Sequence, residues 1–146
     1  MPQDNFSDIY NKALDILSRR EHSKKEVFQK LKSKFSESDL INDVISKLLD
    51  NNLIDDKRFA EHYVAARKRK GFGSKKIGYE LMTKGIDESI STLVINESGD
   101  WDSLASNVFH KKFKSGISDD FKIKAKQKIF LINRGFSFEE IESVFN

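Results

Sequence analysis

The sequence predicts an all-α protein built from three tandem three-helix repeats of about 50 residues. Three observations support this fold class: Pro2 is the single proline, the apolar residues recur at helical spacing, and the chain resembles itself after a shift of 50 residues. Without an internal proline, no position inside the chain is barred from a helix on that ground. Six of the seven glycines fall between the periodic segments and separate one predicted helix from the next.

The helical spacing is clearest between residues 40 and 49. Apolar residues stand there at offsets 0, 1, 4, 5, 8 and 9, which places them on one face of a helix, whereas a strand would alternate. Ile9 and Ala13 follow the same spacing earlier in the chain, as do Val27 and Leu31. Extended along the chain, this spacing predicts nine helices, over residues 7–20, 24–35, 38–51, 56–70, 75–84, 87–97, 100–114, 119–134 and 137–145.

Polar residues that cap helices stand at several of these starts. Ser23 followed by Glu26 has the spacing of a capping box, in which each side chain bonds the backbone amide of the other residue. Ser74 and Ser137 stand before further predicted helices, and the Asp55-Asp56 pair precedes the fourth. An acidic pair can be catalytic, but at a helix start we interpret it as a cap whose charge suits the helix dipole.

A shift of 50 residues aligns the three parts of the chain without a gap. It superimposes Leu31, Leu81 and Leu131, and it places Gly85 on Gly135, opposite Phe35. Because a three-helix unit of this size is only marginally stable alone, we expect each unit to stack on its neighbour. The alternative is one globular nine-helix domain in which the repeat is coincidental. The predicted domains are residues 7–53, 54–98 and 99–146, in an elongated array, straight or curved, that is monomeric.

The composition excludes several classes of protein. No apolar run exceeds four residues, against about 20 for a membrane-spanning helix, so no membrane segment is expected. The chain begins without the basic and apolar blocks of a secretion signal and contains no cysteine, so we expect a cytoplasmic protein. The absence of cysteine also excludes thiol catalysis and every zinc site built on cysteine.

No catalytic or cofactor site is predicted. His22, His62 and His110 have no second histidine four residues away, so a metal pair is not expected. The segment 71–76 matches neither a Walker A loop nor a dinucleotide fingerprint, and no serine stands in a nucleophile elbow. We therefore expect a protein that is not an enzyme and that uses no cofactor.

Charge is distributed unevenly along the chain, although the net charge is only +3. Residues 67–79 contain six cations and no acid, and residues 110–134 contain eight cations against two acids. The segment 37–56, around the third helix, is acidic instead, with six acids and one cation. Since the repeats stack, we expect like charges to align into a positive strip and a separate negative one.

The positive strip supplies the candidate binding residues. Four successive cations at 67–70 point to every side of a helix and repel one another, and a polyanion or an acidic protein surface would relieve that repulsion. The loop Gly71-Phe72-Gly73 adds backbone amides suited to an anion, and Phe72 could either stack on a base or pack between helices. The predicted residues for binding a partner or DNA are Arg67, Lys68, Arg69, Lys70, Lys75 and Lys76, with Lys122, Lys124, Lys126 and Lys128 as a second patch.

The order of residues in the centre of the chain is distinctive. Its parts, in sequence, are Leu53-Ile54-Asp55-Asp56-Lys57-Arg58-Phe59-Ala60, Arg67, Gly71-Phe72-Gly73, Ile77, Glu80-Leu81 and Lys84-Gly85-Ile86-Asp87. This order resembles the central signature of the RecX family, the regulators of the RecA recombinase. The flanks match too, because residues 19–27 resemble the first-repeat pattern of that family and residues 134–137 resemble its final-repeat ending.

The resemblance implies an array of three-helix repeats that lies in the helical groove of the RecA filament on single-stranded DNA. It implies that the protein blocks filament extension or promotes disassembly, and thereby lowers ATP hydrolysis, strand exchange and the co-protease activity that triggers the SOS response. It implies no catalysis. Two alternatives remain open: a DNA-binding helical module without sequence preference, and an adaptor for another helical partner. Weak direct DNA binding is expected from the basic segments in every case.

Overall fold

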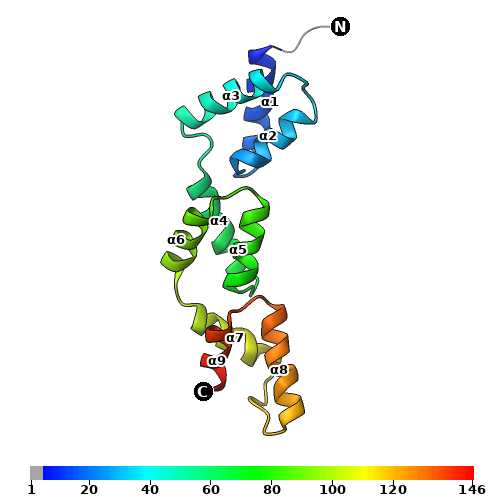
Figure 1. Cartoon of the computed structure of the whole chain (residues 1–146), viewed down its shortest axis with the longest axis vertical. Helices are drawn as coiled ribbons and strands as arrows, with labels where there is room; N and C mark the ends of the chain where they lie inside the picture. Colours follow the sequence, from blue (N-terminus) through cyan, green and yellow to red (C-terminus); the bar gives the residue numbers. More distant parts are fainter. Residues whose placement is uncertain (1–4) are drawn as a thin grey trace.

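The computed structural model describes residues 5–146, and this range contains nine α-helices and no strand (Figure 1). The helices are α1 (Phe6–Leu17), α2 (Lys24–Lys32), α3 (Ser38–Asp50), α4 (Asp56–Arg69), α5 (Ser74–Thr83), α6 (Glu88–Ser98), α7 (Trp101–Lys112), α8 (Phe121–Asn133) and α9 (Phe138–Phe145). The all-α prediction is confirmed. None of the helices in this range is long and apolar enough to cross a membrane. Residues 1–4, part of the segment inspected for a secretion signal, lie outside the described range.

The helix ends lie within three residues of the predicted ones. α1 ends three residues early because Ser18 follows it and donates its Oγ hydrogen to the carbonyl of Asp15, at 2.6 Å. α2 is closed in the same way by Ser33, whose Oγ donates to the carbonyl of Lys30. Short hydroxyl side chains compete in this way for the last carbonyls of a helix. After α2 the apolar spacing continues to Phe35, so the spacing alone does not indicate where this helix ends.

The predicted caps are largely confirmed. Ser23 and Ser137 both form complete capping boxes, and the side chain of Asp55 accepts a hydrogen bond from the amide of Arg58. The prediction for Ser74 is wrong, because Gly73 is the N-cap of α5 and Ser74 is its first residue. The hydroxyl of Ser74 instead donates to the carboxylate of Glu140, in the next repeat, at 2.8 Å. The side chain of Ser74 therefore contacts the next repeat and does not cap its own helix.

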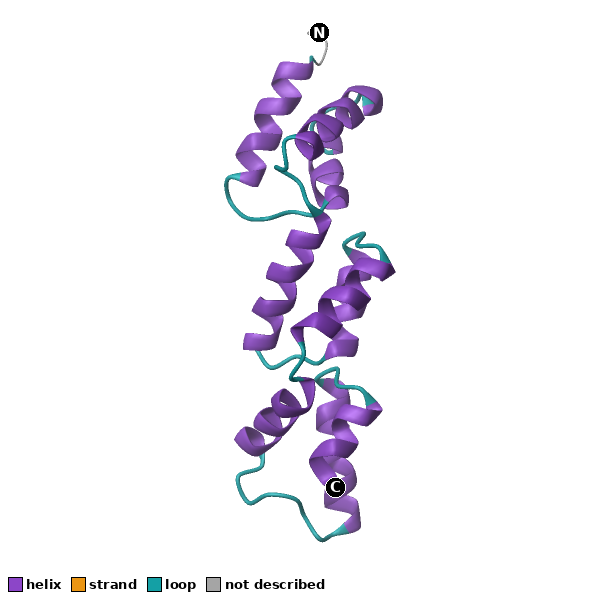
Figure 2. Cartoon of the chain, turned by 90° about the vertical axis from the view of Figure 1, so that its left-hand side faces the viewer, coloured by secondary structure: helices purple, strands orange, loops and turns teal. Residues whose placement is uncertain are grey.

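The helices form three bundles that follow one another along a single long axis (Figures 1 and 2). Each bundle surrounds its own apolar cluster. The three clusters contain Leu31, Leu81 and Leu131 respectively, the residues that the 50-residue shift superimposes. Each of these leucines is fully buried. Ile54, just before α4, packs in the first cluster, and Trp101, the first residue of α7, packs in the second, so each of these residues contributes to the core of the preceding bundle. The domain boundaries predicted from the sequence, after residues 53 and 98, remain predictions.

The first two bundles meet where the end of α5 contacts the start of α2. The hydroxyl of Ser23 donates a hydrogen bond to the carbonyl of Lys84 at 2.7 Å. Gly85 lies there with a positive φ of 82°, and a Cβ on it would come within 2.6 Å of the Cβ of Lys25. Only a glycine lets these two segments of the chain approach so closely.

The second and third bundles meet in the same way, through the end of α8 and the start of α5. The amide of Gly73 donates to the carbonyl of Arg134 at 2.8 Å, and the amide of Lys75 donates to the carbonyl of Gly135 at 2.9 Å. The first amides and the last carbonyls of a helix have no partner within it, so each end satisfies the other. The three basic helices α2, α5 and α8 therefore follow one another along one side of the array (Figure 1).

These contacts explain the glycines that the 50-residue shift superimposed. Gly85 and Gly135 each end the second helix of a repeat and touch the repeat before it. Phe35 is their counterpart in the first repeat, where no earlier repeat has to be approached. The first repeat therefore has Phe35, and not a glycine, at this position.

Replacement of Gly135 by alanine should weaken the contact between the second and third bundles. A Cβ there would lie 2.9 Å from the amide nitrogen of Lys76, with φ at +94°. The backbone strain should cost about 1–2 kcal/mol and the overpacking roughly 1–3 kcal/mol more. Urea unfolding measures this loss of stability. Gly116→Ala is the control, because Gly116 has φ +84° and open space around it. Equal losses in the two variants would contradict the assigned contact.

His22 is a buried polar residue beside the first of these contacts. Its side chain is almost fully covered, with Nδ1 2.9 Å from the carbonyl oxygen of Arg20 and Nε2 2.8 Å from Nζ of Lys30. A neutral ring satisfies both contacts, because Nδ1–H donates to the carbonyl and Nε2 accepts from the ammonium group. Burial lowers the pKa of His22, and the nearby Arg20 and Lys30 charges act in the same direction.

The lowered pKa of His22 predicts a loss of stability on acidification. The unfolded chain binds a proton near pH 6.5 that the folded chain takes up only at lower pH, so the contribution is complete above about pH 6.5 and is lost as the pH falls. Between about pH 7.5 and 5.5, the unfolding free energy of the wild type should fall more steeply than that of His22→Gln. His62→Gln, which alters an exposed histidine, should behave like the wild type. Parallel pH profiles for the wild type and His22→Gln would refute this account.

Candidate partner-binding surface

The cations at 67–70 divide into two pairs with different surroundings. Arg67 forms a two-pronged ion pair with Glu80, with both nitrogen–oxygen distances at 2.9 Å, and its guanidinium lies 4.0 Å from the ring centre of Phe72. Lys68 donates to Oγ of Ser98 and to the carbonyl of Gly99. These two side chains therefore hold α4 to α5 and to the connection after α6, although both were predicted as binding residues.

Glu80 is the centre of a small polar network inside the second bundle. It accepts hydrogen bonds from Arg67 and from the hydroxyl of Tyr63, the latter at 2.9 Å. Burial and the hydrogen bond to Glu80 raise the pKa of Tyr63 to about 12, so this phenol stays neutral over the physiological range. The network is structural. It includes Arg67, which was predicted from the sequence to bind a partner and which pairs with Glu80 instead.

Arg69 and Lys70 are the exposed half of the cluster. Neither side chain has a hydrogen bond or ion pair with another residue in the range 5–146. Lys75 is likewise exposed, while Lys76 lies with its ammonium 5.0 Å from the ring centre of Phe72 and its backbone against Gly135. The predicted run of six cations is thus split between a helix end, a polar network and a contact between repeats.

The expected anion seat in the loop 71–73 is not available. The amides of Gly73, Lys75 and Lys76 all donate to carbonyls of Arg134 or Gly135 in the third bundle. Phe72 packs on the second apolar cluster, with Arg67 and Arg134 against its ring. Of the two interpretations of Phe72, packing between helices is therefore the one observed.

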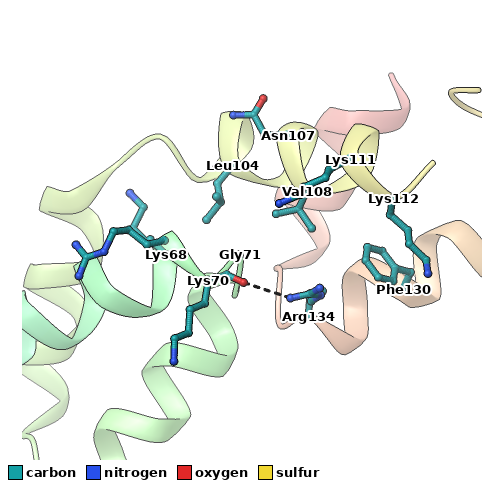
Figure 3. Close-up of a pocket in the computed structure, with 11 residues that line it drawn as sticks. Lys68, Lys70, Gly71, Leu104, Asn107, Val108, Lys111, Lys112, Phe130 and Arg134 are labelled. Carbon is teal, nitrogen blue, oxygen red and sulfur yellow. Dashed lines mark hydrogen bonds between the residues drawn. The ribbon is translucent and has the colours of Figure 1, made fainter. Parts of the chain in front are cut away.

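A groove opens between the second and third bundles, next to the exposed end of α4 (Figure 3). Its volume is about 320 Å³, and six of its eleven lining residues are cations, whereas none is acidic. An apolar floor comes from Leu104, Val108 and Phe130. The six cations are Lys68, Arg69, Lys70, Lys111, Lys112 and Arg134.

The groove is cationic because three helices end there. Arg69 closes α4, Lys112 closes α7, and Arg134 is the C-cap of α8. Basic residues are favourable in the last turn of a helix, where the backbone carbonyls carry partial negative charge. Each cation is thus explained locally, and the tertiary fold then concentrates them on one surface. Arg134 links the two walls, because its guanidinium donates to the carbonyl of Lys70 at 3.3 Å (Figure 3).

The predicted second patch on α8 does not line this groove. Lys122 and Lys126 are exposed. Lys128 forms an ion pair with Glu142 at 3.3 Å, and Lys124 and Lys128 both lie over the ring of Phe145 in α9. The four lysines alternate around the helix, so they form two edges and not one continuous patch.

Lys111, Lys112 and Arg134 line the groove but are not among the binding residues predicted from the sequence. They belong to the basic segment 110–134, whose charge the sequence shows. The missing signal was the side of the helix that each cation faces. Their places in the last turn of α7 and at the C-cap of α8 would have indicated a shared position at the ends of helices.

Family models match this chain over most of its length. They are described as the first, second and third three-helix domains of RecX, and they match residues 10–48, 55–92 and 100–145. The chain belongs to the RecX family. The resemblance predicted from the sequence is confirmed, and so is the expectation of a protein that is not an enzyme, since RecX regulators are not enzymes.

Individual RecX proteins agree with the family assignment over nearly the full chain. Regulatory protein RecX of Serratia proteamaculans is 33% identical, with 96% of this chain and 97% of that protein covered. The RecX protein of Vibrio campbellii is 41% identical over 88% of this chain and 84% of its own length. The crystal structure of RecX from Lactobacillus salivarius superimposes with a TM-score of 0.84 at 31% identity, covering 96% of this chain and 94% of that one.

Two neighbouring arginines should respond differently to replacement by alanine. Arg67→Ala leaves the carboxylate of Glu80 half-buried without its main partner, and should lower the free energy of unfolding by about 1–3 kcal/mol. Arg69→Ala removes an exposed cation without a partner and should change it by less than about 0.5 kcal/mol. Urea unfolding measures both values. A negligible loss in Arg67→Ala would show that the ion pair is not structural.

Proposed function

We propose that this RecX-family chain inhibits RecA by lying along the RecA filament on single-stranded DNA, with the cationic groove against the filament. Bound in this way, it blocks filament extension or promotes disassembly, and so lowers ATP hydrolysis, strand exchange and co-protease activity. The observation that supports the proposal is the groove itself, in which six cations from two repeats gather without an acid. An elongated array of bundles suits binding along another assembly (Figure 1).

The groove has the chemistry to bind phosphates of the filament DNA, an acidic surface of RecA, or both. Arg69, Lys70 and Lys111 are exposed and have no polar partner within the described part of the chain, so a ligand breaks no internal bond when it pairs with them. Charged contacts at such a surface mainly accelerate association and weaken with salt. A DNA-binding module without sequence preference is the second candidate, because the same cations also attract bare DNA.

The experiment is a titration of the protein into pre-formed RecA filaments on single-stranded DNA, with ATP hydrolysis as the readout. A titration of the protein into single-stranded DNA without RecA, at the same salt, is the control. Inhibition well below one chain per RecA protomer would support binding along the filament. Inhibition only at concentrations that coat the bare DNA would favour the second candidate.

Charge reversal in the groove should weaken inhibition of RecA. In Lys70→Glu/Lys111→Glu, we expect the half-inhibiting concentration to rise about tenfold or more near physiological salt, because two attractive charges become repulsive. The matched control is Lys47→Glu/Lys57→Glu, which changes the net charge equally at two exposed lysines outside the groove. Equal effects of the two double variants would show that net charge, and not the groove, is responsible.

A further inference from the structure

The outward face of α8 carries apolar residues that nothing in the fold covers. Phe121 is 85% exposed, Ile129 51% and Ile132 57%, and Ala125 between them is exposed as well. Spacings of four, four and three residues place all four on one side of the helix. We call this set, Phe121, Ala125, Ile129 and Ile132, the apolar stripe.

The apolar stripe is separate from the core and from the cationic groove. Leu131 and Gln127 of α8 face the bundle and are buried, and Phe130 faces the groove. At about 100° per residue, the apolar stripe lies on the side of the helix away from Phe130. In Figure 1, α8 forms the outer edge of the third bundle, with α7 and α9 on its other side. Exposed apolar side chains that lie together on one face, and not singly, are typical of an interaction site.

Lysines border the apolar stripe on both edges. Lys122 and Lys126 follow one edge, and Lys124 and Lys128 follow the other, while α8 contains no acidic residue. Lys122 and Lys126 have no polar partner within residues 5–146. On the other edge, Lys128 already pairs with Glu142. The surface therefore suits a ligand that is apolar along its centre and negatively charged at least along the edge of Lys122 and Lys126.

We propose that the apolar stripe docks an amphipathic α-helix of a partner protein, whose apolar face is bordered by aspartate or glutamate. A straight row of side chains along one helix matches the ridges of a second helix, which can lie against it over about three turns. Under the proposed function, on which this part rests, that helix belongs to the RecA filament. The groove then supplies a salt-sensitive contact, and the apolar stripe supplies a second contact that salt weakens much less.

Other ligands fit this surface less well. Only Phe121 of the apolar stripe has a ring on which a nucleic-acid base can stack, whereas Ala125, Ile129 and Ile132 have none, so successive bases find no row of aromatic rings. Asp119 and Asp120 stand directly before Phe121, where they repel phosphate groups of DNA or of an anionic lipid surface. A protein helix can instead end, or carry a cation, beside these two carboxylates.

The test uses two synthetic fluorescent peptides of about 18 residues, long enough for roughly 27 Å of helix. One arranges leucine and glutamate as an amphipathic helix, and the other has the same composition in scrambled order, so the two differ only in having an apolar face. We expect the wild-type chain to bind the amphipathic peptide about tenfold tighter by fluorescence anisotropy. In Phe121→Ser/Ile129→Ser/Ile132→Ser, this preference should disappear, while Lys70→Glu/Lys111→Glu should retain it.

The same variants are then compared in the RecA titration. The triple serine variant should need about tenfold more protein for equal inhibition, with unchanged affinity for bare single-stranded DNA. The matched control, Tyr79→Ser/Met82→Ser/Leu93→Ser, removes three exposed apolar side chains from the second bundle and should behave like the wild type. Circular dichroism and urea unfolding establish that both variants remain folded.

Several results would overturn the inference. Retention of the peptide preference by the triple serine variant would show that the apolar stripe is not the docking site. Binding of the wild type, but not the variant, to phosphatidylglycerol vesicles without any peptide preference would make it a lipid surface. Concentration-dependent sedimentation that the variant abolishes would make it a contact between copies of this chain. If the wild type fails to inhibit RecA at all, the proposed function fails and the assignment to RecA with it, while the peptide measurement still decides whether the apolar stripe binds a helix.

Discussion

The hydrogen bonds between the end of one helix and the start of another are the contact on which the array depends. At the second contact, carbonyls of Arg134 and Gly135 accept from amides at the start of α5, and at the first the Ser23 hydroxyl donates to the carbonyl of Lys84. Each three-helix bundle has a small core and gains stability from its neighbour. Because the contact joins second helix to second helix, it also fixes which helices share a side of the array.

The placement of the second helices has a direct consequence for charge. Cations that stabilise the last turns of α4 and α7 meet Arg134, at the end of α8, only because the contact at Gly135 brings the third bundle against the second. A residue can therefore serve a helix end and a binding surface together. Arg134 is the clearest example, since it binds the carbonyl of Lys70, packs on Phe72 and still lines the groove.

α8 carries three kinds of surface on a single helix. Leu131 faces the core, Phe130 faces the groove, and Ile129 faces outward on the apolar stripe. A helix with apolar residues on nearly every side has no single apolar face, and burial in a core would ordinarily explain such a pattern. In this chain the third bundle covers one side only, which leaves the outward side for a partner.

The sequence alone determined the nine helices, their order and the existence of the repeat. These follow from local physics: apolar spacing such as that of Val27 and Leu31, caps such as Ser23, and glycines that end helices. It also identified the RecX resemblance through the residues around Asp55 and Gly85. Only the tertiary structure decided what each cation does. Arg67 and Arg69 stand two residues apart in one basic run, yet the first pairs with Glu80 and the second faces the groove. Which neighbour a side chain meets depends on packing between segments distant in sequence, and a count of charges along the chain contains no information about that packing.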